Sequence, residues 1–486
     1  TMQARVTDFL IYKWRYPLGY IFIAVLLVMV VGIAVFTTPG GLRAGEMDST
    51  VKSAALSVES LDTSMVVNLP YHVLQRVVFI LLGVSTVTIK LPSLILGTLT
   101  IVGIFFLARI WFHRNVAVLT TILAATSTQF LFLVQDGTPA IMYSFVVVWL
   151  LLSGTLVTRG YAFNTFWKVL AGVLLASALY MPLGIYLVLT VVVTALLHPH
   201  IRYIIRHITR LRLILAVGLA IAFVTPLVYA CIVNPETLRI LLGVDMTGFV
   251  FIDHLVAMWY AFAGFLSVPN GYVLTPLYSL GLVALMTIGL WRLWQQRHTA
   301  RSYTILILGC LLLPFIFLDT DQAHTVFIVA VMLTGYGIAH LVSSWYRLFP
   351  RNPYARIAGF VPLGIVVLGM IYSGVIRYTH NYTYNPEVLT HFNDDVKLLD
   401  GTLSKLTATQ TASVLTTDDE LPFYNVLAHY DKRFNAITTP STQASILIVT
   451  RNAHASQKVG GTISTIVASA RATDADRFYI YKTNAK

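Results

Sequence analysis

Residues 91–111 read LPSLILGTLTIVGIFFLARIW, and this apolar stretch is long enough to cross a hydrocarbon core of about 30 Å as one helix. Runs of similar length recur up to about residue 375. The chain is 57% hydrophobic and 11% charged, with a mean hydropathy of +0.75, which excludes an ordinary soluble domain. In lipid such runs must be helices, because a helix pairs its own backbone groups without water. The sequence therefore predicts an all-α polytopic membrane protein.

We expect about eleven such membrane-spanning helices. They lie near residues 17–36, 91–111, 116–134, 140–157, 167–181, 183–197, 213–231, 273–291, 303–318, 324–341 and 357–375. The first run could also be a cleaved signal peptide. No small-residue cleavage site follows it, which favours an anchored helix.

Basic residues alternate with the apolar runs in the pattern of the positive-inside rule. With the N-terminus in the cytoplasm, most lysines and arginines before residue 380 fall in inner loops, whereas Asp8 is the only acid there. Membrane topology therefore explains the net charge of +12, and we expect no nucleic-acid partner. The pattern predicts a multi-pass protein of the plasma (inner) membrane, surrounded by membrane lipids, with its C-terminus outside.

The composition changes near Arg377, where charged residues, Thr and Ser become frequent. Strand-like runs at 412–416, 446–450 and 477–482, with helical stretches between them, predict a small α/β domain. We therefore expect a transmembrane domain over residues 1–376 and an extracytoplasmic soluble domain over residues 377–486.

The predicted outer loop, residues 37–90, carries two further helices. One is amphipathic and suits the membrane interface, with an apolar face made of Met47, Val51, Ala54, Val58 and Leu61. The second runs from Pro70 to Leu82 and is short for a span, so we interpret it as juxtamembrane or re-entrant. A third amphipathic stretch covers residues 251–265, in a later outer loop.

The few acids on the outer side are candidates for chemistry, because a carboxylate against the membrane is partly desolvated and can act as a general base. Each also has a structural interpretation, such as capping a helix or complementing its dipole. The candidates are Glu46, Asp48, Asp136, Asp319 and Asp321, with His324 beside the last two. The spacing of the last three matches no metal-ligand pattern. We expect no cofactor and leave a divalent metal open.

Outer basic residues run against the positive-inside trend, which suggests an anionic partner such as a phosphate. Ordinary lipid head groups are the alternative. These residues are Arg43, Lys52, Arg76, Lys90, Arg239 and Arg377.

Three short motifs follow the acid-bearing loop in order: NLPYH at residues 68–72, LGVS at 82–85 and IKLPSL at 89–94. In this order they resemble the GT-C superfamily of membrane glycosyltransferases, in the branch of protein O-mannosyltransferases and lipid A aminoarabinose transferases. The resemblance covers roughly residues 17–160, and beyond them only the layout of the spans.

The chain departs from the family pattern at several positions. The family's Asp-Glu pair falls on Gly45-Glu46, so its first Asp is missing, and one proline of its Pro-Pro-Leu element is lost at Leu69-Pro70-Tyr71. The family's Asp-Pro falls on Thr138-Pro139, which would leave Asp136 as a substitute. The late His or Lys near the lipid phosphate corresponds to His324. These departures leave open whether Glu46 or Asp48 is the base.

The resemblance implies a glycosyltransferase that moves a hexose or pentose from a polyprenyl-phosphate carrier to a protein, lipid or cell-envelope glycan, inverting the anomeric centre in a single displacement. It implies Glu46 as the base and Asp48 and Asp136 as supporting acids. The expected substrate-binding residues are Arg43, Lys90, His324, Asp319 and Asp321.

Two alternatives remain open at this point. A catalytically inactive scaffold or partner-binding protein is suggested by Gly45 and the missing proline. A polytopic transporter would need ionisable residues near mid-span and paired broken helices.

Overall fold

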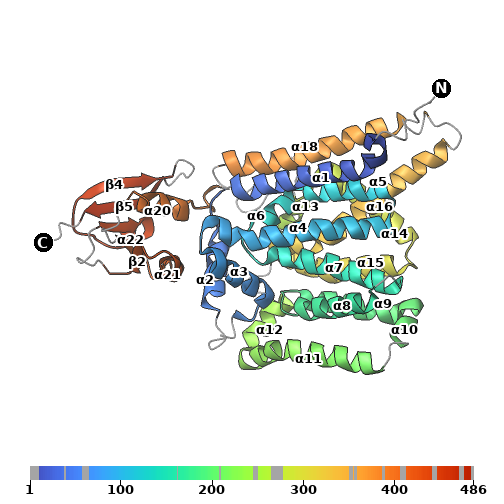
Figure 1. The fold of residues 1–486 in the computed structure, drawn as a ribbon, viewed down its shortest axis with the longest axis horizontal. Helices are drawn as coiled ribbons and strands as arrows, with labels where there is room; N and C mark the ends of the chain where they lie inside the picture. Colours follow the sequence, from blue (N-terminus) through green and yellow to red (C-terminus); the bar gives the residue numbers. More distant parts are fainter. Residues whose placement is uncertain are drawn as a thin grey trace.

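A computed structural model describes residues 10–37, 40–56, 65–160, 163–206, 210–244, 250–263, 277–349, 354, 358–385, 389–405, 412–439, 446–469 and 475–482. Most of these residues are helical, and a small sheet lies near the C-terminus, to one side of the helical bundle (Figure 1). The predicted fold class is therefore confirmed.

Within the described ranges, five helices are long and apolar enough to cross a membrane, or up to seven if two bent pairs each form one span. The five are α4 (Thr86–Trp111), α7 (Ala140–Thr158), α15 (Ala300–Leu318), α16 (Phe327–Leu348), which the 3₁₀ helix η3 (Thr320–Val326) precedes, and α18 (Phe360–Tyr384). The bent pairs are α5 (Arg114–Ala125) with α6 (Thr128–Gln135), and α11 (Arg210–Val233) with α12 (Pro235–Leu242). The chain is thus a multi-pass membrane protein.

Other predicted spans correspond to helices that are shorter or only partly described. These are α1 (Leu10–Thr37), α8 (Asn164–Ala178), α9 (Gly184–Leu197) and α14 (Leu280–Gln295). The predicted span 273–291 corresponds to α14, and its first residues, 273–276, lie outside the described residues. The helix α10 (Pro199–Arg206) is a short connection. The total of eleven spans stays a prediction.

One predicted span, 116–134, is wrong as a single helix, because α5 and α6 meet at an angle of 59°. Thr126 ends α5, and the Ser127 side chain accepts a hydrogen bond from the Phe130 backbone N–H, which caps a new helix. The break redirects α6, whose C-cap is Asp136.

The helices α2 (Ala44–Ala55) and α3 (Leu69–Leu82) lie at the end of the bundle nearest the C-terminal sheet (Figure 1). With 14 residues, α3 is shorter than a membrane-spanning helix, which agrees with a juxtamembrane helix. Ile80 and Leu81 are exposed, whereas Tyr71 and Phe79 are fully buried. Residues 57–64, with the end of the predicted interfacial helix, are outside the described ranges.

The C-terminal sheet has the strand order β2-β1-β3-β5-β4. Its strands are β1 (Ala412–Leu415), β2 (Phe434–Ile437), β3 (Ile446–Thr450), β4 (Ile463–Ala468) and β5 (Asp476–Lys482), and its helices are α20 (Asp395–Leu403), α21 (Leu421–Tyr430) and α22 (Arg451–Ser456). The first three strands pair in parallel, and β5 is antiparallel to both neighbours. The sequence predicted β1, β3 and β5 and missed β2 and β4.

This C-terminal region is joined to the membrane part by backbone and side-chain contacts. The backbones of Leu42 and Asn393 exchange two hydrogen bonds of 2.8 and 2.9 Å. The Arg76 guanidinium donates to the Tyr430 hydroxyl at 2.7 Å. The predicted division at residue 376 remains a prediction, and α18 continues through that position to Tyr384.

Candidate active site

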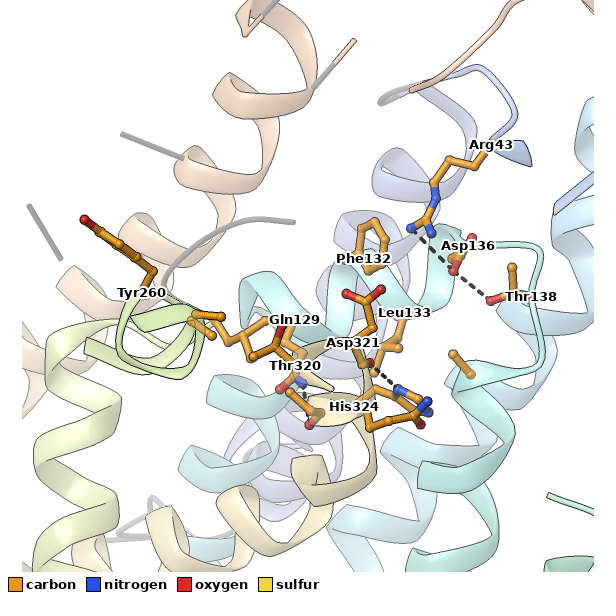
Figure 2. A pocket seen from close by; sticks show the side chains of 16 residues that line it. Arg43, Gln129, Phe132, Leu133, Asp136, Thr138, Tyr260, Thr320, Asp321 and His324 are labelled. Atoms are coloured by element: carbon orange, nitrogen blue, oxygen red, sulfur yellow. Dashed lines mark hydrogen bonds and ion pairs between the residues drawn. The ribbon is translucent and has the colours of Figure 1, made fainter. Parts of the chain in front are cut away.

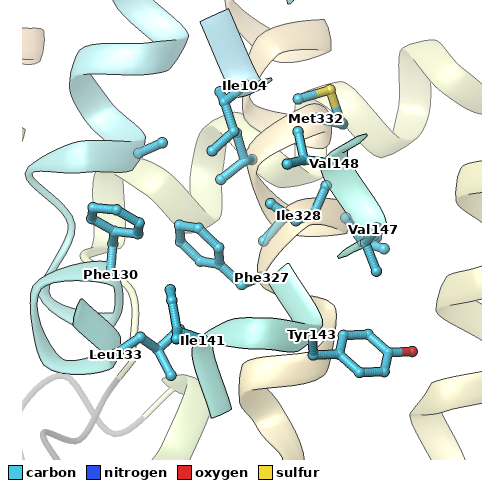
Figure 3. Close-up of a cluster of buried hydrophobic side chains, with 14 of the residues drawn as sticks. Ile104, Phe130, Leu133, Ile141, Tyr143, Val147, Val148, Phe327, Ile328 and Met332 are labelled. Carbon is cyan, nitrogen blue, oxygen red and sulfur yellow. The ribbon is translucent and has the colours of Figure 1, made fainter. Parts of the chain in front are cut away.

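A cavity of about 440 Å³ opens where the start of α2, the turn between α6 and α7, η3 and α13 (Phe251–Ala263) meet (Figure 2). Four of the ionisable residues singled out in the sequence border it: Arg43, Asp136, Asp321 and His324. Leu133, which lines the cavity, also belongs to the buried core in which Phe130 stacks on Phe327 at 5.7 Å, so the cavity borders closely packed side chains (Figure 3).

Arg43 and Asp136 face each other across one wall of the cavity. Arg43 Nη1 lies 3.9 Å from Asp136 Oδ2, and the guanidinium also sits over the Phe132 ring at 5.1 Å (Figure 2). Asp136 Oδ2 accepts a hydrogen bond of 2.7 Å from the Thr138 hydroxyl, whereas the buried Oδ1 has no partner among the described residues. The Arg43 side chain is 31% exposed and lines the cavity, so a ligand there can contact it.

The 3₁₀ helix η3 forms the opposite wall. His324 Nδ1 lies 2.9 Å from the Asp321 carbonyl oxygen (Figure 2). A carbonyl oxygen only accepts, so Nδ1 carries the hydrogen and Nε2 of the neutral ring is an acceptor. Asp319 is not part of the cavity wall. Its carboxylate caps η3 by accepting from the Asp321 backbone N–H and the Gln322 amide.

Glu46, the base expected from the sequence, lies behind the wall that carries Arg43 and Asp136, and it is completely buried. Its Oε1 accepts from the Gly137 backbone N–H at 2.6 Å, and its Oε2 accepts from the Arg43 backbone N–H at 2.7 Å. Burial raises the pKa of the Glu46 carboxyl, and the ammonium of Lys90, 3.7 Å from Oε1, opposes that shift. Glu46 does not line the cavity.

A glycine at position 137 makes this contact possible. A Cβ atom there would stand 3.0 Å from the Ile89 carbonyl oxygen and 3.1 Å from Glu46 Oε1. A side chain at this position would therefore push the turn away from the carboxylate.

Lys90 is also enclosed rather than open to a ligand, and only 1% of it is exposed. Its ammonium donates to the Gly41 carbonyl oxygen at 2.8 Å and to Gln135 Oε1 at 2.9 Å. It is absent from the cavity wall, so an approach to a phosphate there is not part of this arrangement.

Asp48 is turned away from the cavity. Its carboxylate pairs with Lys52 one helical turn later at 2.7 Å, and its side chain is 63% exposed. At the neighbouring position where the family pattern has Asp, a Cβ on Gly45 would touch the Thr138 methyl at 3.7 Å. The missing carboxylate would therefore have stood beside the turn that carries Asp136.

Several lining residues were not singled out from the sequence: Gln129, Phe132, Thr138 and Tyr260. The first two lie on α6, where the sequence predicted an unbroken span. Tyr260 belongs to the amphipathic stretch that the sequence did predict. Within the described ranges, no three His, Cys, Asp or Glu side chains gather in a way that could hold a metal ion.

Comparison with known protein families gives one match. The family model for "Dolichyl-phosphate-mannose-protein mannosyltransferase" matches residues 70–229. No curated protein sequence matches the chain.

Solved structures resemble the chain over nearly its whole length. ArnT from Cupriavidus metallidurans in the apo state is 15% identical with a TM-score of 0.51, and covers 97% of this chain and 99% of its own. The same protein bound to undecaprenyl phosphate is 14% identical with a TM-score of 0.52, covering 96% and 98%. The Archaeoglobus fulgidus oligosaccharyltransferase tethered with an acceptor peptide is 12% identical with a TM-score of 0.50, covering 89% and 65%.

At such identities the likeness shows a common fold. Together with the family match, it confirms the resemblance seen in the sequence. The chain therefore has the fold of ArnT, a membrane glycosyltransferase of the GT-C superfamily, and its residues 70–229 match a mannosyltransferase family model.

Proposed function

We propose that this chain transfers a monosaccharide from a polyprenyl-phosphate carrier to an acceptor hydroxyl. The observation that carries the proposal is the cavity in which a guanidinium, two carboxylates and an imidazole meet on a GT-C fold. The structurally similar ArnT binds undecaprenyl phosphate, which supports a carrier of this lipid class here. A protein, lipid or glycan could supply the hydroxyl.

The cavity end of the bundle then faces the extracytoplasmic side. At the other end of α4, Arg159 donates to the Ile110 carbonyl oxygen and Arg301 to that of Trp111. Arginines gathered at that end suit the cytoplasmic face, by the positive-inside rule. In this orientation the cavity and the C-terminal sheet lie on the side where a lipid-linked sugar and its acceptor would meet.

In the proposed reaction the acceptor oxygen attacks the anomeric carbon, and the bond from that carbon to the phosphate oxygen breaks. The electron pair leaves with polyprenyl phosphate, and the hydroxyl proton passes to a carboxylate. One in-line displacement inverts the anomeric centre. The phosphate gains negative charge as it leaves, so a cation beside it stabilises the transition state more than the ground state.

Among the acids expected from the sequence, Asp136 suits the role of base best. It borders the cavity, and its side chain accepts one hydrogen bond, from Thr138, whereas both Glu46 oxygens already accept from backbone N–H groups. The exposed edge of Arg43 would hold the phosphate. Asp321 would accept hydrogen bonds from sugar hydroxyls.

His324 would serve either partner, depending on its protonation. The neutral ring offers Nε2 as an acceptor to a sugar hydroxyl, and the protonated ring offers a donor to the phosphate.

Release of polyprenyl phosphate from radiolabelled lipid-linked hexoses and pentoses tests the proposal without knowledge of the acceptor, because water can replace it slowly. We expect the purified protein to release the carrier from at least one donor. Asp136→Asn should lower the rate by about 10²–10⁴-fold. Glu236→Gln, which breaks an exposed ion pair with Arg239, is the matched control.

A scaffold protein would release no carrier from any donor, which would overturn the proposal. Retained turnover in Asp136→Asn, with loss in Asp321→Asn, would move the base to the opposite wall of the cavity. An effect of Asp321→Asn confined to the KM for the donor, about tenfold, would agree with sugar binding.

A further inference from the structure

Two short segments carry the charged residues of one cavity wall: residues 41–43, which end in Arg43, and residues 135–138, which contain Asp136. Glu46 bonds to both segments through its two oxygens. One accepts from the backbone N–H of Arg43 and the other from that of Gly137. The carboxylate is completely buried, so water does not compete for either bond.

Lys90 connects the same two segments independently. Its ammonium donates to the carbonyl oxygen of Gly41 at one segment and to Oε1 of Gln135 at the other. The two side chains also form an ion pair of 3.7 Å with each other, with side chains 2% and 0% exposed. A catalytic base, or a cation that binds the phosphate, needs access to the substrate. Neither the Glu46 carboxylate nor the Lys90 ammonium has this access.

The surroundings fix this pair in place. The Gln75 amide donates to the Ile89 carbonyl oxygen at 3.0 Å, next to Lys90 on α4, and its oxygen accepts from Ser53 on α2 at 2.6 Å. Helices α2, α3 and α4 are therefore tied together around the ion pair. A change in its charge would act on the spacing of the two segments rather than on an isolated side chain.

We infer that Glu46 and Lys90 are positioning residues that set the distance between Arg43 and Asp136 by joining segments 41–43 and 135–138. The effect on catalysis rests on the proposed function, whereas the effect on spacing does not. Glu46 would thus matter for activity without touching substrate.

Disulfide formation measures the spacing directly. In a background with Cys231→Ser and Cys310→Ser, Gly45→Cys and Thr138→Cys would bring two thiols together, since a Cβ at position 45 lies 3.7 Å from the Thr138 side chain. We expect rapid closure with the ion pair intact. With Glu46→Gln and Lys90→Met together, closure should slow at least about tenfold, which is a change of about 1.4 kcal/mol in the barrier.

Glu236→Gln with Arg239→Gln, an exposed ion pair on α12, is the matched control and should close at the parent rate. Glu46→Gln alone serves if the double variant does not fold. Its amide oxygen can accept from only one of the two segments, so closure should be intermediate. Parent-like closure in the folded variants would overturn the inference.

Activity is measured in proteins without the reporter cysteines. Misplaced Arg43 and Asp136 should lower kcat by about 10²-fold at saturating donor, with a smaller change in KM. Slow closure without any transferase activity in the parent would keep the spacing role and reject the proposed function. Normal closure with parent-like kcat would reject the positioning role alone.

Discussion

Two groups of ionisable side chains adjoin the turn 135–138, and they differ in how fully their hydrogen-bonding capacity is used. Behind the cavity wall, both oxygens of Glu46 accept backbone hydrogen bonds and the Lys90 ammonium donates twice. Inside the cavity, Asp136 keeps one oxygen without a partner among the described residues, and Arg43 stays partly exposed. The hydrogen-bonding capacity of Glu46 and Lys90 is used without a ligand, whereas that of Asp136 and Arg43 is not.

This difference separates a structural carboxylate, Glu46, from a carboxylate that is a candidate for the chemistry, Asp136. Residue type and position pointed to Glu46, but a base must offer a lone pair to the acceptor proton. A carboxylate that already receives two short backbone hydrogen bonds, in a site closed to water, has its strongest acceptor positions occupied. Asp136 borders the cavity, and its Oδ1 accepts no hydrogen bond from the described residues.

The largest expected effect is that of Lys90→Met on stability. Removal of the ammonium leaves the Glu46 carboxylate buried without its ionic partner, which costs about 3–5 kcal/mol of unfolding free energy. Unfolding in mixed detergent–SDS micelles would measure it. Breaking the exposed Asp48–Lys52 pair by Lys52→Met should cost at most about 0.5 kcal/mol. Equal losses in the two variants would contradict the contrast.

The defect of Lys90→Met should depend on pH. Burial already raises the pKa of Glu46 above the ordinary 4.5, and loss of Lys90 removes the main opposing charge. A carboxyl with a raised folded pKa loses stability as pH rises through that value, and the penalty vanishes below the pKa of the unfolded chain. The stability gap to the parent should therefore shrink between neutral pH and pH 4.5, measured by the same unfolding assay. A gap that is constant with pH would show that Glu46 is not its source.

A smaller effect is expected inside the cavity from Thr138→Val. This change keeps the side-chain shape but removes the hydroxyl that donates to Asp136 Oδ2 at 2.7 Å. The carboxylate would lose its orientation, and kcat should fall about tenfold, equivalent to about 1.4 kcal/mol. Thr138→Ser restores the donor and should restore most of the rate in the carrier-release assay. If Val and Ser variants turn over equally fast, the hydroxyl does not orient Asp136.

Much of the fold was predictable because few backbone structures are stable in lipid. Apolar runs longer than a membrane is thick must be helical, so α4, α7 and α16 followed from composition. The break between α5 and α6 did not. Thr126 and Ser127 are weak helix breakers within an apolar run, and packing against distant helices decides whether the chain bends there.

The site was harder to predict for a related reason. Glu46 belongs to a helix whose polar side should face water, but Lys90 on α4 and the turn at Gly137 lie against it from positions distant in the chain. Arg43, Asp136, Asp321 and His324 were identified from residue type and loop position. That they border one cavity depends on the bend before α6 and on the turn η3, which a single sequence does not encode locally.

The strands show the same limit on a smaller scale. The runs at β1 and β3 are apolar and fully buried, so their composition indicated strands. By contrast, β4 is exposed along most of its length and β2 has four residues, so neither carries a strong local pattern. Both strands form because a neighbour offers an edge to pair with.

The two-residue backbone pair between Leu42 and Asn393 has a practical consequence for modularity. Its two hydrogen bonds hold the chain one residue before Arg43. The approach is close, because a Cβ at Gly41 would stand 2.8 Å from the Asn393 carbonyl oxygen. A protein shortened before residue 386 would lose this pair and uncover Leu42 and Phe79, which are buried in the apolar cluster shared with the C-terminal sheet. Exchange of C-terminal regions between relatives should therefore preserve this pairing, because the two parts share these hydrogen bonds and this apolar cluster.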